Sequence, residues 1–173
     1  SYTDGQGTNE GPLVSLATAV VANVDDEASG TLSVTGTVAE GGTLIASLSD
    51  VTDIDGTTTT AYRWQENVGG TWTDLFGQSA ATLTIPSDQS YVGKSVRAVA
   101  TTTDVLGGTT EFTSTAQTIA NVNDAPTGLS TISGVATRGQ VLSANTSGIA
   151  DADGLGTFSY VWKADGTPIV GAT

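Results

Sequence analysis

Apolar and polar side chains alternate at every second position in several short stretches between residues 30 and 120. The apolar positions are Leu32 and Val34, Leu44 with Ala46 and Leu48, Tyr62 and Trp64, Leu83 and Ile85, Val96 with Ala98 and Ala100, and Ile119. A period of two places these side chains on one face of a β-strand. Turn-forming residues separate the stretches, at Gly41-Gly42, Asp55-Gly56, Gly69-Gly70, Pro86 with Asp88, and Gly107-Gly108. The pattern predicts about seven short strands.

The strand spacing and the composition together predict an all-β fold. About seven strands over roughly 100 residues are typical of a two-sheet sandwich of the immunoglobulin-like or cadherin-like kind. Hydrophobic residues make up 38% of the chain and charged residues only 13%, which is enough apolar material for a core and unlike a disordered composition. We interpret Trp64 and Trp162 as core residues and Trp72 as an exposed one.

Charge and missing residue types exclude several kinds of chemistry. The chain has 18 Asp and Glu against 5 Lys and Arg, a formal net charge of −13, and neither His nor Cys. These absences exclude imidazole and thiolate metal ligands, the usual nucleophile–base pairs with His, and disulfides. The negative charge argues against nucleic acid as a partner, and no stretch approaches the roughly 18 to 20 apolar residues of a membrane span. The expected partner is a hard cation held by oxygen atoms.

An internal repeat organises the chain. Asn23-Val24-Asp25-Asp26 recurs as Asn121-Val122-Asn123-Asp124 at an offset of 98, and the ungapped alignment reaches Trp64 and Trp162 with 15 identities in 42 positions. The repeat predicts the C-terminal part of a first unit in residues 1–22, a complete sandwich repeat in 23–120, and the N-terminal part of a third unit in 121–173. Since neither end piece has the strands of a full sandwich, we expect each to fray or to pair head to tail with neighbouring molecules.

Acidic and amide side chains recur at both boundaries between the units, in a linker and in a following Asp-x-Asp-Gly loop. The candidate metal ligands are Asn23, Asp25, Asp26, Asp53 and Asp55 at the first boundary, and Asn121, Asn123, Asp124, Asp151 and Asp153 at the second. Ca²⁺ takes about six to eight oxygen ligands, and the loop places two carboxylates on the same side of an extended segment. Each motif alone also fits an ordinary Asx turn or an extended linker, but their co-occurrence at one offset favours calcium.

Two further acidic residues are candidate ligands outside these motifs. Asp104 lies near the last predicted hairpin, and Asp4 is its counterpart in the first unit. Glu40 follows the first predicted strand of the complete repeat. The evidence for Glu40 is weaker because the aligned residue, Arg138, would place a cation where a ligand is needed.

Four sequence strings carry a resemblance to a known family. They are Asn121-Val-Asn-Asp-Ala-Pro-Thr-Gly, Gly148-Ile-Ala-Asp-Ala-Asp-Gly-Leu-Gly, Phe158-Ser-Tyr-Val-Trp and Tyr2-Thr-Asp-Gly-Gln-Gly-Thr. They resemble the tandem repeats of very large bacterial adhesins of the repeats-in-toxin type. The linker is also similar to the calcium-binding linker of cadherins, and Asp151-Ala-Asp153 to the Asp-x-Asp of the following cadherin domain.

The resemblance implies type I secretion, an extracellular or cell-surface location, and a calcium-stiffened rod that extends a terminal binding domain from the cell. The first linker departs from the pattern, with Glu27-Ala28 in place of Ala-Pro. The glycine-rich nonapeptide that binds calcium in β-rolls is absent, so the expected calcium is interdomain.

Two functions are compatible with the sequence. The first is a non-catalytic extender module whose Ca²⁺ ions rigidify the junctions between neighbouring repeats. The second is a carbohydrate- or protein-binding sandwich that uses exposed aromatic residues such as Trp72, Phe76 or Tyr91. We do not expect an enzyme, because the paired carboxylates lie at junctions of an elongated array, and phosphate-loop, dinucleotide-binding and nucleophile-elbow motifs are all absent.

Overall fold

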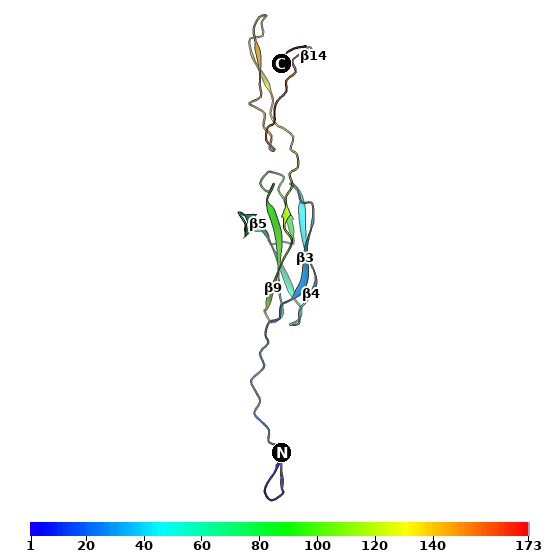
Figure 1. Cartoon of the computed structure of the whole chain (residues 1–173), viewed down its shortest axis with the longest axis vertical. Coiled ribbons are helices and arrows are strands. Elements are labelled where there is room, and N and C mark those ends of the chain that lie inside the picture. Colours follow the sequence, from blue (N-terminus) through cyan, green and yellow to red (C-terminus); the bar gives the residue numbers. More distant parts are fainter. Residues whose placement is uncertain (173) are drawn as a thin grey trace.

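The computed structural model describes residues 1–172, and all regular secondary structure in these residues is β-strand. Figure 1 shows a central sandwich with an extended N-terminal tail at one end and a smaller C-terminal segment at the other. Within residues 1–172, no helix is long and apolar enough to cross a membrane. The prediction of an all-β fold is confirmed.

Eight strands form the central sandwich. One sheet has the order β3-β4-β7, and the other has the order β10-β8-β5-β6, with β9 also pairing with β8. The strands are β3 (Ser29–Gly36), β4 (Thr43–Thr52), β5 (Thr59–Val68), β6 (Thr71–Asp74), β7 (Thr82–Thr84), β8 (Ser95–Thr103), β9 (Thr109–Thr113) and β10 (Gln117–Thr118). All of their pairings are antiparallel. The turns at the lower end of this sandwich, which Figure 1 shows nearest the N-terminus, carry the first candidate site.

The hydrophobic core lies between the two sheets, around Trp64. This side chain is 0% exposed, and its Nε1 donates a hydrogen bond of 3.0 Å to the Ala80 carbonyl, which satisfies the buried donor. The buried side chains that pack around it come from both sheets and from the segment after β10: Leu44, Ala46, Leu83, Ile85, Val96, Ala98 and Ile119. The predicted alternation is confirmed, because the positions it assigned to the inner face are all buried or partly buried.

Three separate hairpins flank the sandwich. They consist of β1 (Tyr2–Thr3) with β2 (Asn9–Glu10), β11 (Thr131–Gly134) with β12 (Leu142–Asn145), and β13 (Lys163–Ala164) with β14 (Thr167–Pro168). Residues 11–28 contain no strand and link the first hairpin to β3.

Two of these hairpins match hairpins of the sandwich residue for residue. Gly134 pairs with Leu142 as Gly36 pairs with Leu44, 98 residues earlier. Likewise, the pairs Tyr2–Glu10 and Thr3–Asn9 have the register of Thr102–Thr110 and Thr103–Thr109, at an offset of 100. The same local sequence pattern therefore gives the same strand pairing inside and outside the sandwich.

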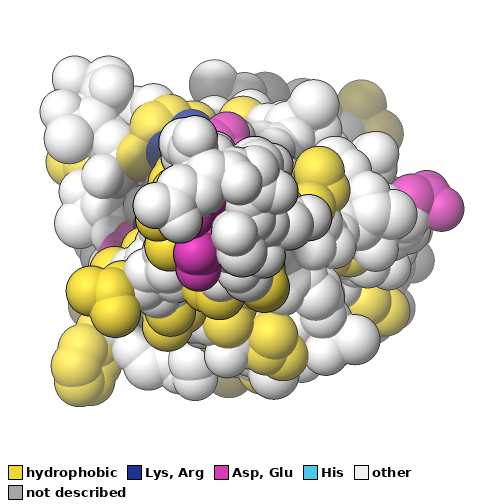
Figure 2. Space-filling view, turned by 90° about the horizontal axis from the view of Figure 1, so that it is seen from below, with side chains coloured by type: hydrophobic (Ala, Val, Ile, Leu, Met, Phe, Trp, Pro, Cys, Tyr) yellow, Lys and Arg dark blue, Asp and Glu magenta, His cyan; other side chains and the backbone are white. Residues whose placement is uncertain are grey.

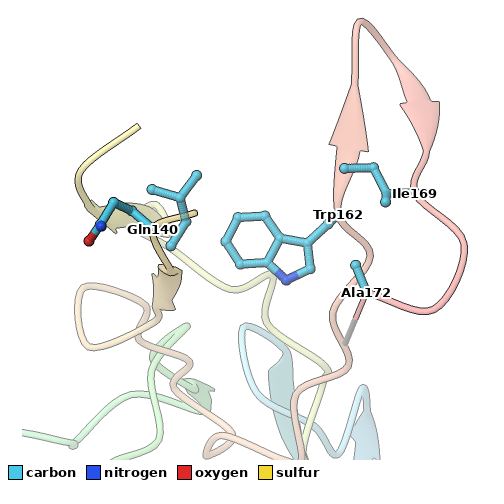
Figure 3. Close-up of a pocket in the computed structure, with 5 residues that line it drawn as sticks. Gln140, Trp162, Ile169 and Ala172 are labelled. Carbon is cyan, nitrogen blue, oxygen red and sulfur yellow. The ribbon is translucent and has the colours of Figure 1, made fainter. Parts of the chain in front are cut away.

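The C-terminal segment presents an open apolar face. Leu142 is 37% exposed, whereas the aligned Leu44 is 0% exposed. Trp162, which aligns with Trp64, lines an open pocket of about 380 Å³ together with Gln140, Ile169 and Ala172 (Figure 3). Among the described residues, no second sheet covers this face.

Candidate metal centres

Three carboxylates from separate parts of the chain meet at the N-terminal end of the sandwich. Asp25 belongs to the linker before β3, Asp55 to the loop after β4, and Asp104 to the turn between β8 and β9. One oxygen atom of each carboxylate lies within 4.8 Å of the other two. Figure 2 looks at this end of the molecule and shows acidic side chains on a face with few basic ones. We call Asp25, Asp55 and Asp104 the first acidic cluster.

Asp55 attaches the linker to the sandwich. Its Oδ1 accepts a hydrogen bond of 2.8 Å from Asn23 Nδ2, and its Oδ2 accepts one of 2.7 Å from the backbone N–H of Asp26. The loop is closed by a bond of 2.9 Å from the backbone N–H of Asp55 to Asp53 Oδ1. Gly56 follows with φ of 121°, a conformation that glycine adopts without steric cost. The Asp-x-Asp-Gly sequence thus fixes a turn that presents Asp55 to the linker.

Asp104 is held by the backbone of its own turn. Its Oδ1 accepts hydrogen bonds from the N–H groups of Leu106, Gly107 and Gly108, at 2.6, 2.7 and 3.0 Å. Desolvation acts to raise the pKa of Asp104, but these N–H donors outweigh it and lower the pKa below its ordinary value. The residue is 8% exposed. It is therefore a fixed, ionised carboxylate.

The first acidic cluster carries negative charge that the protein does not neutralise. Desolvation, followed by the negative charges of Asp104 and Asp55, raises the pKa of Asp25. The ion pairs of residues 1–172 join Arg63 to Asp74 and Glu111, and Lys94 to Glu66, so they involve none of the three carboxylates. A set of carboxylate oxygens without nitrogen or sulfur ligands fits a hard cation such as Ca²⁺.

The second boundary reproduces the hydrogen bonds of the first. Asp153 Oδ1 accepts from Asn121 Nδ2 at 2.7 Å, and Asp153 Oδ2 accepts from the backbone N–H of Asp124 at 2.6 Å. The backbone N–H of Asp153 donates to Asp151 Oδ1 at 2.9 Å, as in the first loop. Each of these atoms is the counterpart of one found 98 residues earlier. The hydrogen bonds from Asp124 and Asn121 lower the pKa of Asp153.

The sandwich contributes two further side chains to the second boundary. Glu40 is buried, and its Oε2 lies 3.5 Å from the backbone N–H of Val122. Gln89, in the loop between β7 and β8, directs its Nε2 towards the same place, 3.5 Å from Glu40 Oε2 and 2.9 Å from Asp153 Oδ1. The same nitrogen lies 2.9 Å from Asn121 Oδ1 and 3.4 Å from Asp124 Oδ2 in the linker. Oxygen atoms of the sandwich, the linker and the following loop therefore surround the Gln89 amide nitrogen. We call Glu40, Asn121, Asp124 and Asp153 the second oxygen cluster.

The predicted ligands do not all contribute side-chain oxygens to these two clusters. Asp26 meets Asp55 through its main chain, and Asp53 and Asp151 use Oδ1 to close their own turns. Asn123 donates from its side chain to the Asp124 carbonyl at 3.0 Å, without a hydrogen bond to Asp153.

Gln89 was not identified from the sequence. The repeat alignment covers only residues 23–64 of the sandwich, so no second copy marks position 89. An amide in a loop also carries no charge signal, and only the folded arrangement brings it to the boundary.

The aromatic residues considered for ligand binding lie in different environments. The Trp72 ring faces the Arg97 guanidinium, with the centroid 4.3 Å from Cζ, and the Tyr91 ring lies 5.2 Å from Lys94 Nζ. Phe76 is fully exposed. Trp72 is thus partly covered by a cation, which differs from the exposed position expected for it.

Comparison of the chain with protein families gives no match, and comparison with curated proteins gives none either.

Proposed function

We propose that this chain is a non-catalytic, calcium-binding extender module made of tandem immunoglobulin-like or cadherin-like repeats. The units are residues 1–22, 23–120 and 121–173. One ion binds in the first acidic cluster, at the N-terminal end of the central unit, and another binds where the central unit meets the third. The observation that carries the proposal is the set of hydrogen bonds that recurs, atom for atom, around Asp55 and Asp153. The same linker-to-loop contact at both boundaries is the arrangement that a repeated junction site requires.

The mechanism is electrostatic. Without metal, the carboxylates of each boundary repel one another, and this repulsion acts to loosen the linker. With metal, the charges are neutralised and the linker is held against the following repeat. Extracellular calcium modules have dissociation constants on the order of 10⁻⁴ to 10⁻³ M, so such a chain would be flexible in calcium-poor cytosol and stiffen after export.

The setting that fits this mechanism is a large bacterial adhesin of the repeats-in-toxin type, at the cell surface or secreted. The partners are calcium ions and the neighbouring repeats of the same chain. A second sheet would pack on the open face around Trp162 and Leu142, and a neighbouring molecule that supplied such strands would associate head to tail.

Calcium addition and chelation test the proposal on the whole chain. At 1 mM calcium and a dissociation constant of about 10⁻⁴ M, each site stabilises the folded state by about 1.4 kcal/mol. For a domain of this size, each kcal/mol of stabilisation raises the melting temperature by roughly 4 to 8 °C. Small-angle X-ray scattering should show a longer maximum dimension with calcium than with chelator. If neither quantity responds to chelation, the proposal is wrong.

A matched pair of variants locates the effect. Asp104→Asn keeps an oxygen that accepts the three backbone N–H groups but removes the charge from the first acidic cluster. Asp4→Asn makes the same change in the equivalent turn of the first hairpin, where Asp4 Oδ1 accepts from the N–H groups of Gln6 and Thr8 and belongs to no cluster in the described residues. We expect the calcium response to weaken in the first variant and not in the second.

A further inference from the structure

Gln89 lies where three parts of the chain meet. Its loop is fixed by the preceding residue, because Asp88 Oδ1 accepts a hydrogen bond of 2.9 Å from the backbone N–H of Ser90. This Asx turn holds position 89 at the end of the sandwich, next to Glu40. The amide is therefore presented to the linker and to the following loop by a rigid turn.

The Gln89 amide nitrogen is surrounded by the second oxygen cluster. Nε2 lies 2.9 Å from Asn121 Oδ1, 2.9 Å from Asp153 Oδ1, 3.4 Å from Asp124 Oδ2 and 3.5 Å from Glu40 Oε2. A carboxamide has only two N–H donors, so the two shorter contacts are the hydrogen bonds. The other two oxygens, of Asp124 and Glu40, lie near the nitrogen but receive no hydrogen bond from it. Three of these four oxygens belong to carboxylates.

These contacts cross the boundary between units. Gln89 belongs to the sandwich, Asn121 and Asp124 to the linker, and Asp153 to the loop of the C-terminal segment. One side chain thus joins the end of the sandwich to both parts of the next unit. At the first acidic cluster, the side-chain amide that donates is that of Asn23, which belongs to the linker itself, and no described residue of 1–22 donates to the cluster.

We propose that Gln89 is a latch that holds the second boundary in its ordered arrangement without metal, and that a bound cation must displace its amide N–H₂ from the second oxygen cluster. The second half of this statement rests on the proposed function, whereas the first half does not. Because Gln89 acts at the second boundary alone, the two boundaries differ in how ordered they are without calcium. Without calcium the second stays ordered while the first loosens, so stiffening on export begins from a chain that is already partly aligned.

The first half of the proposal is tested by spin-label distances in the chelated protein. The chain has no Cys, so Thr73→Cys on β6 and Ser143→Cys on β12, both exposed, give one label on each side of the boundary. In excess chelator we expect a narrow distance distribution with Gln89 and a broad one in Gln89→Ala. Gln117→Ala on β10 is the matched control, because this partly buried glutamine makes no side-chain hydrogen bond across the boundary, and its distribution should stay narrow. An equally narrow distribution in Gln89→Ala would overturn the latch.

The second half is tested by calcium titration calorimetry of the same variants. Removing the competing amide should tighten calcium binding at the second boundary by roughly threefold to tenfold in Gln89→Ala, the range expected for one net hydrogen bond. Gln89→Lys, which places an ammonium group among the same oxygens, should weaken it and keep the chelated distribution narrow. Weaker binding in Gln89→Ala would overturn the competition. If no variant binds calcium while the chelated distance effect persists, the proposed function fails and the latch stands.

Discussion

Gly108→Ala is the sharpest single perturbation of the first acidic cluster. Gly108 lies in the turn that holds Asp104, and its N–H donates to Asp104 Oδ1. A Cβ at this position would collide with the Asp25 carboxylate and lie 2.6 Å from Asp104 Oδ2. The φ of Gly108 is outside the left-handed region, so alanine meets no backbone strain there. The substitution therefore removes space from the cluster without placing alanine in a strained backbone conformation.

The size of the effect follows from the charge that is displaced. Asp25 is the exposed and least constrained member of the cluster, so it is the side chain that turns away. In a water-like dielectric, a divalent ion and a carboxylate about 4 Å apart attract one another strongly enough to change a dissociation constant by roughly thirtyfold. From a starting value on the order of 10⁻⁴ to 10⁻³ M, binding at this cluster would fall to the millimolar range or weaker.

Calorimetric titration with calcium is the assay, with the melting temperature in chelator as a measure of the fold. Gly156→Ala is the matched control, because its Cβ would meet open space and its φ is also outside the left-handed region. Asp25→Ala should weaken calcium binding by a similar factor, and adding Gly108→Ala to it should cost little more, since both changes remove the same ligand. Wild-type affinity in Gly108→Ala, with an unchanged fold, would refute the assignment of the cluster as the metal site.

Three other results are expected. Calcium binding at the first acidic cluster is present above the raised pKa of Asp25 and is lost as the pH falls through it. The lowered pKa of Asp153 lets the second boundary bind calcium down to a lower pH. Calcium titrations at successively lower pH should therefore show binding lost first at the first cluster and then at the second boundary. Trp64→Ala should destabilise the sandwich by about 3 to 5 kcal/mol in denaturant unfolding, far more than Trp72→Ala, whose ring is partly exposed. Glycan arrays should give no signal, and saturable binding that Trp72→Ala abolishes would favour the carbohydrate-binding alternative.

The strands could be predicted because each depends on a local pattern. The alternation of Leu44 with Ala46, and of Val96 with Ala98, identifies the inner face of β4 and β8 without knowledge of their partners. Sheet order could not be obtained in this way. The assignment of β9 and β10 to β8 depends on contacts between residues that the sequence pattern does not connect.

The candidate site was partly predictable for a similar reason. The repeat placed Asp53 and Asp55 in one loop and Asn23 in one linker, and those residues do meet. The pattern could not predict that Asp26 would contact Asp55 through its backbone N–H and not through its carboxylate. In a linker without strands, the direction of a side chain is set only by the contacts it makes. Gln89 is the clearest residue that the sequence pattern did not predict, because a turn of the sandwich places its amide against residues of the next unit.

The most direct test of calcium binding between the units is a crystal structure in millimolar calcium, with anomalous scattering used to locate the ions. We predict one ion bound by Asp25, Asp55 and Asp104 and another within the second oxygen cluster, with the Gln89 amide nitrogen turned away from it. Ordered crystals grown in millimolar calcium in which both clusters hold only water or the Gln89 amide would contradict this prediction.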